Sequence, residues 1–300
     1  MSDSVLGSLA ALATAVVWTS TVMFFQSAGQ RVGSLPVNLL RLVLGLFFLL
    51  VANLLWRGQA WPLDASGHSW LWLALSGLVG FSLGDLFLFR AFVLVGGRLA
   101  MLVMSLVPPL TAIIAALALG ESLNATGWLG MAVTVSGVAW VVLEREGTGG
   151  ARAGARSYWQ GLLFAFLGAV GQASGLVLSK YGMGSYHPLP STIIRVLAGI
   201  AGFTLVITVL GRWRQVRQAL DDRGALLRIA AGAFFGPFLG VTLSLTSVQL
   251  IAAGVASTIM SIVPVLILAP AALIFKEKIG PRAVLGALLA VCGVALLFLT

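Results

Sequence analysis

The sequence predicts an all-α, polytopic membrane protein with ten transmembrane helices in two inverted five-helix repeats. Its 300 residues are 59% hydrophobic and only 9% charged, whereas about a quarter of the residues in a soluble domain are charged. Apolar stretches of about 20 residues, the length that a helix needs to cross the hydrocarbon core, recur along the chain. The second half of the chain also repeats residue patterns of the first half.

The predicted spans are bounded by clusters of charged residues and turn formers. Tryptophans lie near several span ends, where their amphipathic rings prefer the level of the lipid headgroups. The spans cover residues 5–28, 35–56, 69–95, 98–120, 125–143, 157–180, 188–211, 225–250, 254–275 and 281–299. A hydrophilic segment after the fifth span divides the chain almost in half. We therefore expect two domains, residues 1–146 and 157–300, joined by a linker over residues 147–156.

The two halves are related by duplication. The motif SLVPPL at residues 105–110 reappears as SIVPVL at residues 261–266. Nearer the start of each half, Arg41 corresponds to Arg195. Because five spans are an odd number, the second copy must enter the membrane from the opposite side. Inverted repeats recur in secondary transporters, whose solute site lies near the midplane between the halves, so the repeat predicts transport of a small solute.

The repeated residues resemble those of the EamA family in the drug/metabolite transporter superfamily. The shared pattern is a proline in the fourth helix of each half, a glutamate at the end of that helix, and two glycines seven apart in the fifth. In this chain the pattern comprises Pro108, Glu121, Gly130 and Gly137, and then Pro264, Glu277, Gly286 and Gly293. The resemblance covers nearly the whole chain. It implies a central cavity, alternating access and no cofactor, but it does not imply which solute. Because the family includes exporters of amino acids and related metabolites, we expect export of such a metabolite across a bacterial inner membrane.

Asp85 and Arg90 are the charged residues that lie deepest within a predicted span. An ionisable residue inside the membrane indicates a functional site by default, because leaving it unpaired costs several kcal/mol. Their equivalents in the second half are Val241 and Thr246, so these charges are present in one half only, as recognition of a particular solute requires. We predict that Asp85 takes part in solute or proton handling. The alternative is a structural ion pair with Arg90 or Arg41.

Pro108 and Pro264 are predicted to kink their helices, because proline removes a backbone hydrogen bond. The kinks recur at equivalent places in both halves, which favours residues of the cavity wall over mere tolerance of proline. The resemblance also implies that polar and aromatic residues within spans lie near the cavity. The predicted solute-binding residues are Trp18, Asp85, Arg90, Met104, Ser105, Gln172, Gln249, Met260 and Ser261.

Other repeated residues are predicted to be structural. The glycine pairs lie on one helix face, where small residues allow two helices to approach closely. Glu121 and Glu277 are expected to cap the N-terminus of the helix that follows each of them.

Other function classes are disfavoured. An intramembrane enzyme needs a nucleophile with a base, or a cluster of metal ligands, at membrane depth. Both histidines are placed in loops, and Cys292 is the only cysteine, so we expect no enzyme, no metal and no cofactor. The net charge of +9 comes mainly from helix ends, where anionic headgroups explain it better than nucleic acid.

The expected partners are the lipid bilayer and a small solute, and the oligomeric state stays open. An uncharged or zwitterionic metabolite is favoured, because a multiply charged one would call for more charge inside the membrane. A facilitative carrier, or a carrier of anions bound by Arg41, Arg90 and Arg195, stays open as an alternative. Lys and Arg gather in loops after odd-numbered spans, which predicts termini outside the cell, whereas the resemblance implies termini inside.

Overall fold

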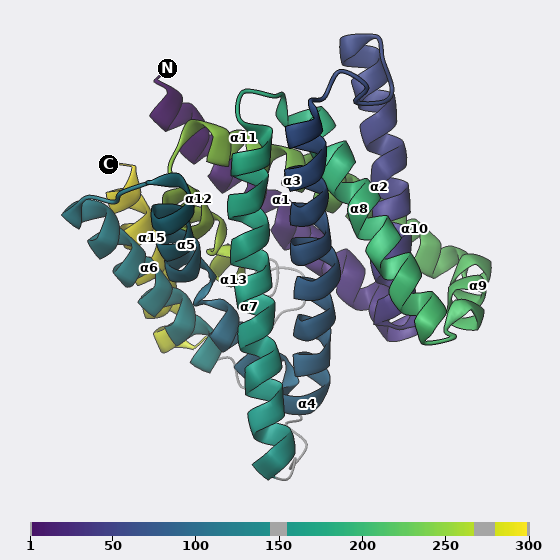
Figure 1. Ribbon diagram of the computed structural model, residues 1–300. Helices are drawn as coiled ribbons and strands as arrows, with labels where there is room; N and C mark the ends of the chain where they lie inside the picture. The colour runs from purple at the N-terminus through teal and green to yellow at the C-terminus, as the bar shows by residue number, and fades with distance from the viewer. Residues whose placement is uncertain (1, 145–154, 267–279, 299–300) are drawn as a thin grey trace.

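The computed structural model describes residues 2–144, 155–266 and 280–298, and every regular element among them is helical (Figure 1). The first half contains α1 (Asp3–Val32), α2 (Ser34–Arg57), α3 (Gly67–Gly77), the π-helix η1 (Leu78–Gly84), α4 (Asp85–Met104), α5 (Val107–Leu119) and α6 (Ala125–Glu144). The second half contains α7 (Ala155–Met183), α8 (Pro188–Val209), α9 (Trp213–Asp221), α10 (Arg223–Ala233), the π-helix η2 (Phe234–Gly240), α11 (Val241–Leu250), α12 (Ala253–Met260), α13 (Val263–Leu266) and α15 (Pro281–Leu297). The all-α prediction is thus confirmed for the described residues.

Six helical stretches of the described chain are long and apolar enough to cross a membrane, and two shorter apolar helices accompany them. The six stretches are Asp3–Val32, Ser34–Arg57, Gly67–Ala91, Ser157–Met183, Pro188–Val209 and Arg223–Leu250. The chain is therefore a multi-pass membrane protein. The count of ten spans stays a prediction, because the predicted spans 98–120 and 254–275 are not single helices. The second of them ends outside the described residues, as does most of the linker over 147–156.

Helix α9 lies in a segment that the sequence analysis left as a loop. Its residues alternate with helical period between arginines or glutamines and the buried side chains of Val216 and Ala219. These two side chains belong to a core cluster that also contains Ile207 and Ile229. This short helix packs its apolar stripe against α2 and α10, and it is too short and too polar to cross a membrane.

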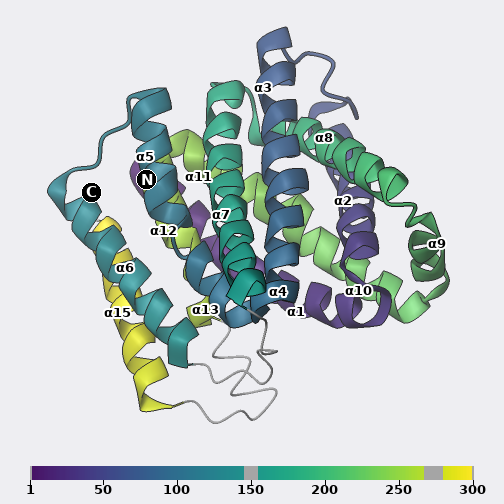
Figure 2. The same ribbon diagram turned by 60° about the horizontal axis from the view of Figure 1, so that its bottom comes forward.

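Figures 1 and 2 show how the helices are arranged. Helices α6 and α15 lie side by side at one end of the molecule, while α2, α8, α9 and α10 gather at the other. Between them, α7 packs along α3, η1 and α4, and α1 packs along α10, η2 and α11. The first helix of each half therefore packs against the third helical stretch of the other half. The fold cannot be separated into two independent five-helix units.

The α6–α15 interface is built on the repeated glycines. A Cβ atom added at Gly137 would lie 2.6 Å from the carbonyl oxygen of Gly286, and one added at Gly293 would lie 2.8 Å from that of Gly130. The two helix backbones thus approach within contact distance, as small residues permit. The predicted packing role of these glycines is confirmed.

The two π-helices occupy equivalent positions, since η2 follows η1 at the same spacing that relates SIVPVL to SLVPPL. Gly84 ends η1 and contacts Gln172 of α7, and Gly240 ends η2 and contacts Trp18 of α1. Trp18 and Gln172 are themselves repeat equivalents. The halves thus contact each other reciprocally, as two copies related by a two-fold axis do. A π-helix is rare and frequently marks a functional site, and nothing in the sequence analysis predicted these two.

Candidate functional site

A buried charged cluster lies where η1 passes into α4. Asp85 is only 8% exposed and accepts hydrogen bonds from two side chains. The guanidinium of Arg41, on α2, forms an ion pair with its Oδ2. The side-chain amide of Gln172, on α7, donates to its Oδ1 at 2.8 Å. Of the two ion-pair partners considered for Asp85, the structure selects Arg41. Because Gln172 belongs to the second half, the cluster joins both halves of the chain.

The π-helix η1 positions this cluster. The amide of Gln172 also donates to the carbonyl oxygen of Gly80 at 3.3 Å, so one side chain holds both the carboxylate and the backbone of η1. A Cβ added at Gly84 would lie 3.4 Å from both the backbone nitrogen and Nε2 of Gln172, an ordinary contact distance. On the α7 side, a Cβ added at Gly171 would lie only 2.9 Å from the Cα of Gly84. Glycine at position 171 therefore allows the close approach of α7 to η1 beside Asp85.

Arg41 is held on its second side by an aromatic ring. Its Cζ lies 5.4 Å from the ring centroid of Phe25 on α1, within the range of a cation–π contact. Its Nε is buried and makes no hydrogen bond. The charge of Arg41 is therefore compensated chiefly by Asp85, so that the pair is close to neutral.

Arg195, the repeat equivalent of Arg41, has no such carboxylate. It is 5% exposed, and its Cζ lies 4.9 Å above the ring of Phe81 in η1. Within the described part of the chain it forms no ion pair and no hydrogen bond through its side chain, and its Nε is buried without a partner. The residue equivalent to Asp85 in the second half is Val241, which is 6% exposed. The described bundle thus holds one buried arginine, Arg195, one partly buried arginine, Arg41, and one buried aspartate, Asp85.

The sequence analysis named Arg195 as part of the repeat pattern and as a candidate anion-binding residue, but it did not place Arg195 in the site. The sequence contained an indication of this, because the arginine is present in both halves, as Arg41 and Arg195, whereas the aspartate is present only in the first half, as Asp85. That indication could be interpreted only once Arg41 and Asp85 were known to be partners.

The predicted helix kinks are present as complete breaks. Helix α4 ends at Met104 and α5 begins at Val107, and α12 ends at Met260 and α13 begins at Val263. Pro108 thus lies in the first turn of α5, where the missing N–H costs nothing. The prediction of a continuous kinked helix is corrected in this respect, and Pro264 occupies the equivalent place in α13. The breaks free backbone groups at equivalent points of the two halves.

The residues beside the breaks mostly face the protein interior. Met260 and Ser105 are buried, and Met104 and Ser261 are partly buried. The hydroxyl of Ser261 donates to the carbonyl oxygen of Thr258 at 2.7 Å, so it satisfies its own helix end. Their assignment to a cavity wall stays a prediction.

Two predicted site residues lie apart from the cluster. Arg90 is exposed on α4 about one and a half turns beyond Asp85, so it does not join the cluster, and its role in solute binding stays a prediction. Gln249, near the end of α11, donates to the carbonyl oxygens of Gly184 and Tyr186 at 2.9 and 3.1 Å. It thereby ties α11 to the loop between α7 and α8. The structure brings together Trp18 with Gly240, and Gln172 with Asp85, but not these two residues.

The sequence profile of the EamA-like transporter family matches residues 5–143 and again residues 159–299. The chain belongs to the EamA-like transporter family. Among solved structures, one described as "Crystal structure of protein" shares 20% sequence identity with a TM-score of 0.72, over 97% of this chain and 95% of the other. That likeness concerns the fold alone. No curated protein matches the chain.

Membership in the EamA-like family confirms the resemblance drawn from the paired Pro, Glu and Gly residues. It makes the chain a transporter of the drug/metabolite type, in agreement with the predicted function class. The two matched segments also agree with the predicted duplication.

A second charged group of this EamA-like chain connects the two halves at the end of the bundle. Glu121, after α5, accepts a hydrogen bond from the backbone nitrogen of Ala253 at 2.7 Å. Its other oxygen forms an ion pair with Lys180 of α7 at 2.5 Å, and Lys180 donates to the carbonyl oxygen of Ile251 at 2.6 Å. The expectation that Glu121 caps the helix following it is therefore wrong, because it caps α12 of the other half. Glu277 lies outside the described residues.

We expect this Glu121–Lys180 contact to hold that end of the bundle closed. Lys180→Gln should therefore increase opening between α5 and α12, and a cysteine at the buried Ser257 reports it. In a Cys292→Ser background, the rate of thiol labelling of Ser257→Cys should rise roughly fivefold, the equivalent of about 1 kcal/mol for a partly exposed ion pair. Lys180→Arg keeps the charge and serves as the control. Equal labelling rates with and without the Lys180→Gln substitution would assign the contact to static packing.

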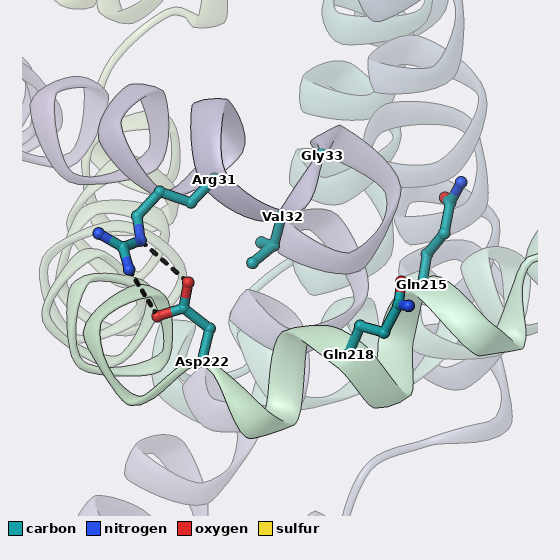
Figure 3. Close-up of a pocket in the computed structure, with 6 residues that line it drawn as sticks. All are labelled: Arg31, Val32, Gly33, Gln215, Gln218 and Asp222. Carbon is teal, nitrogen blue, oxygen red and sulfur yellow. Dashed lines mark hydrogen bonds and ion pairs between the residues drawn. The ribbon is translucent and has the colours of Figure 1, made fainter.

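One pocket of the EamA-like chain lies at the surface of the described fold. It has a volume of about 360 Å³ and lies between the end of α1 and the polar face of α9 (Figure 3). Arg31 donates to Asp222 through two bonds of 2.9 and 3.1 Å, and these bonds lower the pKa of that carboxyl. Asp222 also caps α10 through the backbone nitrogen of Ala225. Since the lining residues form a structural cap and ion pair, we do not place the solute there.

The loop between α2 and α3 carries a third charged group. Arg57 and the hydroxyl of Tyr186 donate to Asp64 at 2.6 and 2.9 Å. Hydrogen bonding to Arg57, and more weakly to Tyr186, holds the pKa of Asp64 below its ordinary value of 3.8. The folded-state pKa is thus the lower one, so the stabilisation is fully present above the ordinary value and is lost as the pH falls through the folded-state value.

Asp64→Asn should accordingly lower stability by about 0.2–1 kcal/mol at neutral pH, because the pair is solvent-exposed. Thermal unfolding in detergent between pH 7 and pH 3 measures this difference. The difference in stability between the parent and the Asp64→Asn variant should shrink below pH 3.8, and it should also shrink in high salt. A difference that stays constant across this pH range would show that the carboxylate charge contributes nothing.

Proposed function

We propose that the chain is a secondary transporter that moves a small metabolite, an amino acid or a related solute, by alternating access. The observation that carries this proposal is the Arg41–Asp85–Gln172 cluster, which joins both halves at a π-helix in the interior. A fold whose halves contact each other reciprocally supports ten crossings in two inverted repeats over residues 1–146 and 157–300, because such repeats commonly place the solute between them. Export across a bacterial inner membrane belongs to the same proposal.

The cluster offers a route to proton coupling. The ion pair with Arg41 requires an ionised Asp85, so protonation would remove that ion pair and release the guanidinium. The helices that carry the two residues, α2 and α4, would then be held together less tightly. A group whose partner changes with protonation can couple a proton to a conformational change, provided that the two states bind the proton with different affinity. Asp85 is thus the proposed coupling residue.

Three other functions are alternatives to a proton-coupled transporter. A facilitative carrier of the same fold would use the cluster for structure alone. A carrier of anionic metabolites is favoured by one specific observation, namely that Arg195 has no carboxylate partner among the described residues. An intramembrane enzyme finds no support in the cluster, which offers no nucleophile beside a base.

The test is uptake into proteoliposomes of the purified protein. A panel of labelled amino acids and nucleosides is offered with and without an imposed pH gradient, beside Asp85→Asn. Asparagine preserves the shape and can still accept hydrogen bonds, but it cannot titrate. Gradient-driven uptake in the parent that is lost in a folded Asp85→Asn variant supports proton coupling. Uptake that is unchanged in the variant points to facilitated diffusion, and absence of uptake for every solute contradicts the proposed solute class.

A further inference from the structure

We propose that Arg195 binds a single anionic group of the transported solute, with a carboxylate as the group that fits best. This inference rests on the proposed transport function and narrows its solute class. It replaces the wider range of uncharged and zwitterionic solutes by those that carry one carboxylate, whether zwitterions or monoanions.

Arg195 lacks a protein counter-ion among the described residues. A buried guanidinium inside a membrane protein is costly unless it is paired. Arg41 meets this requirement through Asp85, whereas the equivalent of Asp85 in the second half is the apolar Val241. Among the described residues, Arg195 has the ring of Phe81 and no carboxylate. The folded chain therefore keeps one buried positive charge for which its described residues supply no negative partner.

The guanidinium of Arg195 lies between an aromatic ring and a glycine. The ring of Phe81 interacts with the guanidinium charge, and it accepts none of the hydrogen bonds that the guanidinium can donate. On another side lies Gly80, where even an added Cβ would stay 3.6 Å from Nη2. The space that this Cβ would occupy, beside Nη2, is therefore free of other atoms. A planar fork of N–H donors is complementary to a carboxylate, which it can bind through two parallel hydrogen bonds.

Arg195 is connected to Asp85 through η1 and Gln172. The carbonyl oxygen of Gly80 accepts from Gln172, and the same amide donates to Asp85. Arg195 lies beside Gly80 and Phe81 of η1, and Asp85 directly follows the end of η1 at Gly84. An anion on Arg195 would therefore act on the π-helix that leads into the proposed proton site. The same π-helix is in position to couple the two events.

The charges of Arg41, Asp85 and Arg195 do not cancel. The buried Arg195, the partly buried Arg41 and the buried Asp85 together carry a net charge of +1, which one carboxylate neutralises. A dianion would reverse the excess, and a cation would increase it. Solutes with one carboxylate should therefore bind, while their amides and amines should bind at least tenfold more weakly.

Thermal unfolding of the full-length protein in neutral detergent tests this proposal without transport. Its nine tryptophans provide the fluorescence signal. Sodium propionate, propionamide and propylammonium chloride, which share a three-carbon skeleton, are added at constant chloride. Propionate should raise the unfolding midpoint of the parent, and propionamide and propylammonium should not. The effect should be lost in Arg195→Gln and weakened in Arg195→Lys, which keeps the charge but loses the fork. Arg212→Gln, an exposed change just beyond α8, should respond as the parent does.

The outcomes separate the alternatives. A propionate shift that persists in Arg195→Gln, an equal shift with propionamide, or no shift at all would overturn the proposal. If phosphatidylglycerol reproduces the shift and propionate does not, Arg195 holds a lipid headgroup and the proposal is overturned as well. If Arg195→Gln does not fold, Arg195→Lys decides. A propionate shift without uptake of any panel solute would preserve the carboxylate site and contradict the proposed transport function.

Discussion

Replacing Asp85 by valine, the residue at the equivalent place in the second half, should destabilise the protein by about 3–5 kcal/mol. The substitution leaves the partly buried guanidinium of Arg41 without its carboxylate inside the bundle, and removing one partner of a buried pair costs about this much. The amide of Gln172 loses an acceptor in the same step. The unfolding midpoint in detergent should fall accordingly.

A double-mutant cycle separates the ion pair from general packing. Arg41→Gln together with Asp85→Val should cost less than the two single changes added, by at least about 1 kcal/mol, since contacting residues are not additive. Arg90→Gln is the matched control, because Arg90 is exposed on the same helix as Asp85, and its effect should add to that of Asp85→Val. Additive effects of Arg41 and Asp85 would mean that their contact contributes nothing to stability.

The second large effect is expected at the α6–α15 interface. Gly137→Ala should destabilise the protein by about 2 kcal/mol, because the new Cβ would approach the backbone of Gly286 and Ala290 and force the two helices apart. Gly29→Ala is the matched control within α1. A Cβ there meets nothing within 4 Å, so alanine should be neutral or stabilise by up to about 1 kcal/mol.

The measurement is again the unfolding midpoint, with Gly29→Ala and Gly137→Ala compared in the same detergent. The two substitutions should have opposite signs or differ by at least about 2 kcal/mol. A small effect at both positions would show that α6 and α15 can move apart at no cost. In that case the close contact would be incidental to folding.

The paired glycines were predicted correctly from the sequence, whereas the contact of Glu121 was not. Glycines seven apart predicted close helix packing, and the interface contains it, because spacing along one helix fixes which side chains share a face. Glu121 was expected to cap the next helix and caps α12 instead. A carboxylate beside a loop can reach any helix start that the fold brings near, and the sequence does not say which start that is.

The charged cluster around Asp85 was likewise predictable from the sequence only in part. The sequence alone determined that the chain is a multi-pass membrane protein built by duplication, because apolar length and a repeated pattern are properties of the chain itself. It also singled out Asp85 as a charge within a span. Only the tertiary structure decided that Arg41 is its partner, that Gln172 reaches it across the halves, and that Arg195 is left unpaired among the described residues. The reason is that charge pairing depends on which helices adjoin, and α2, α4, α7 and α8 adjoin only in the folded bundle.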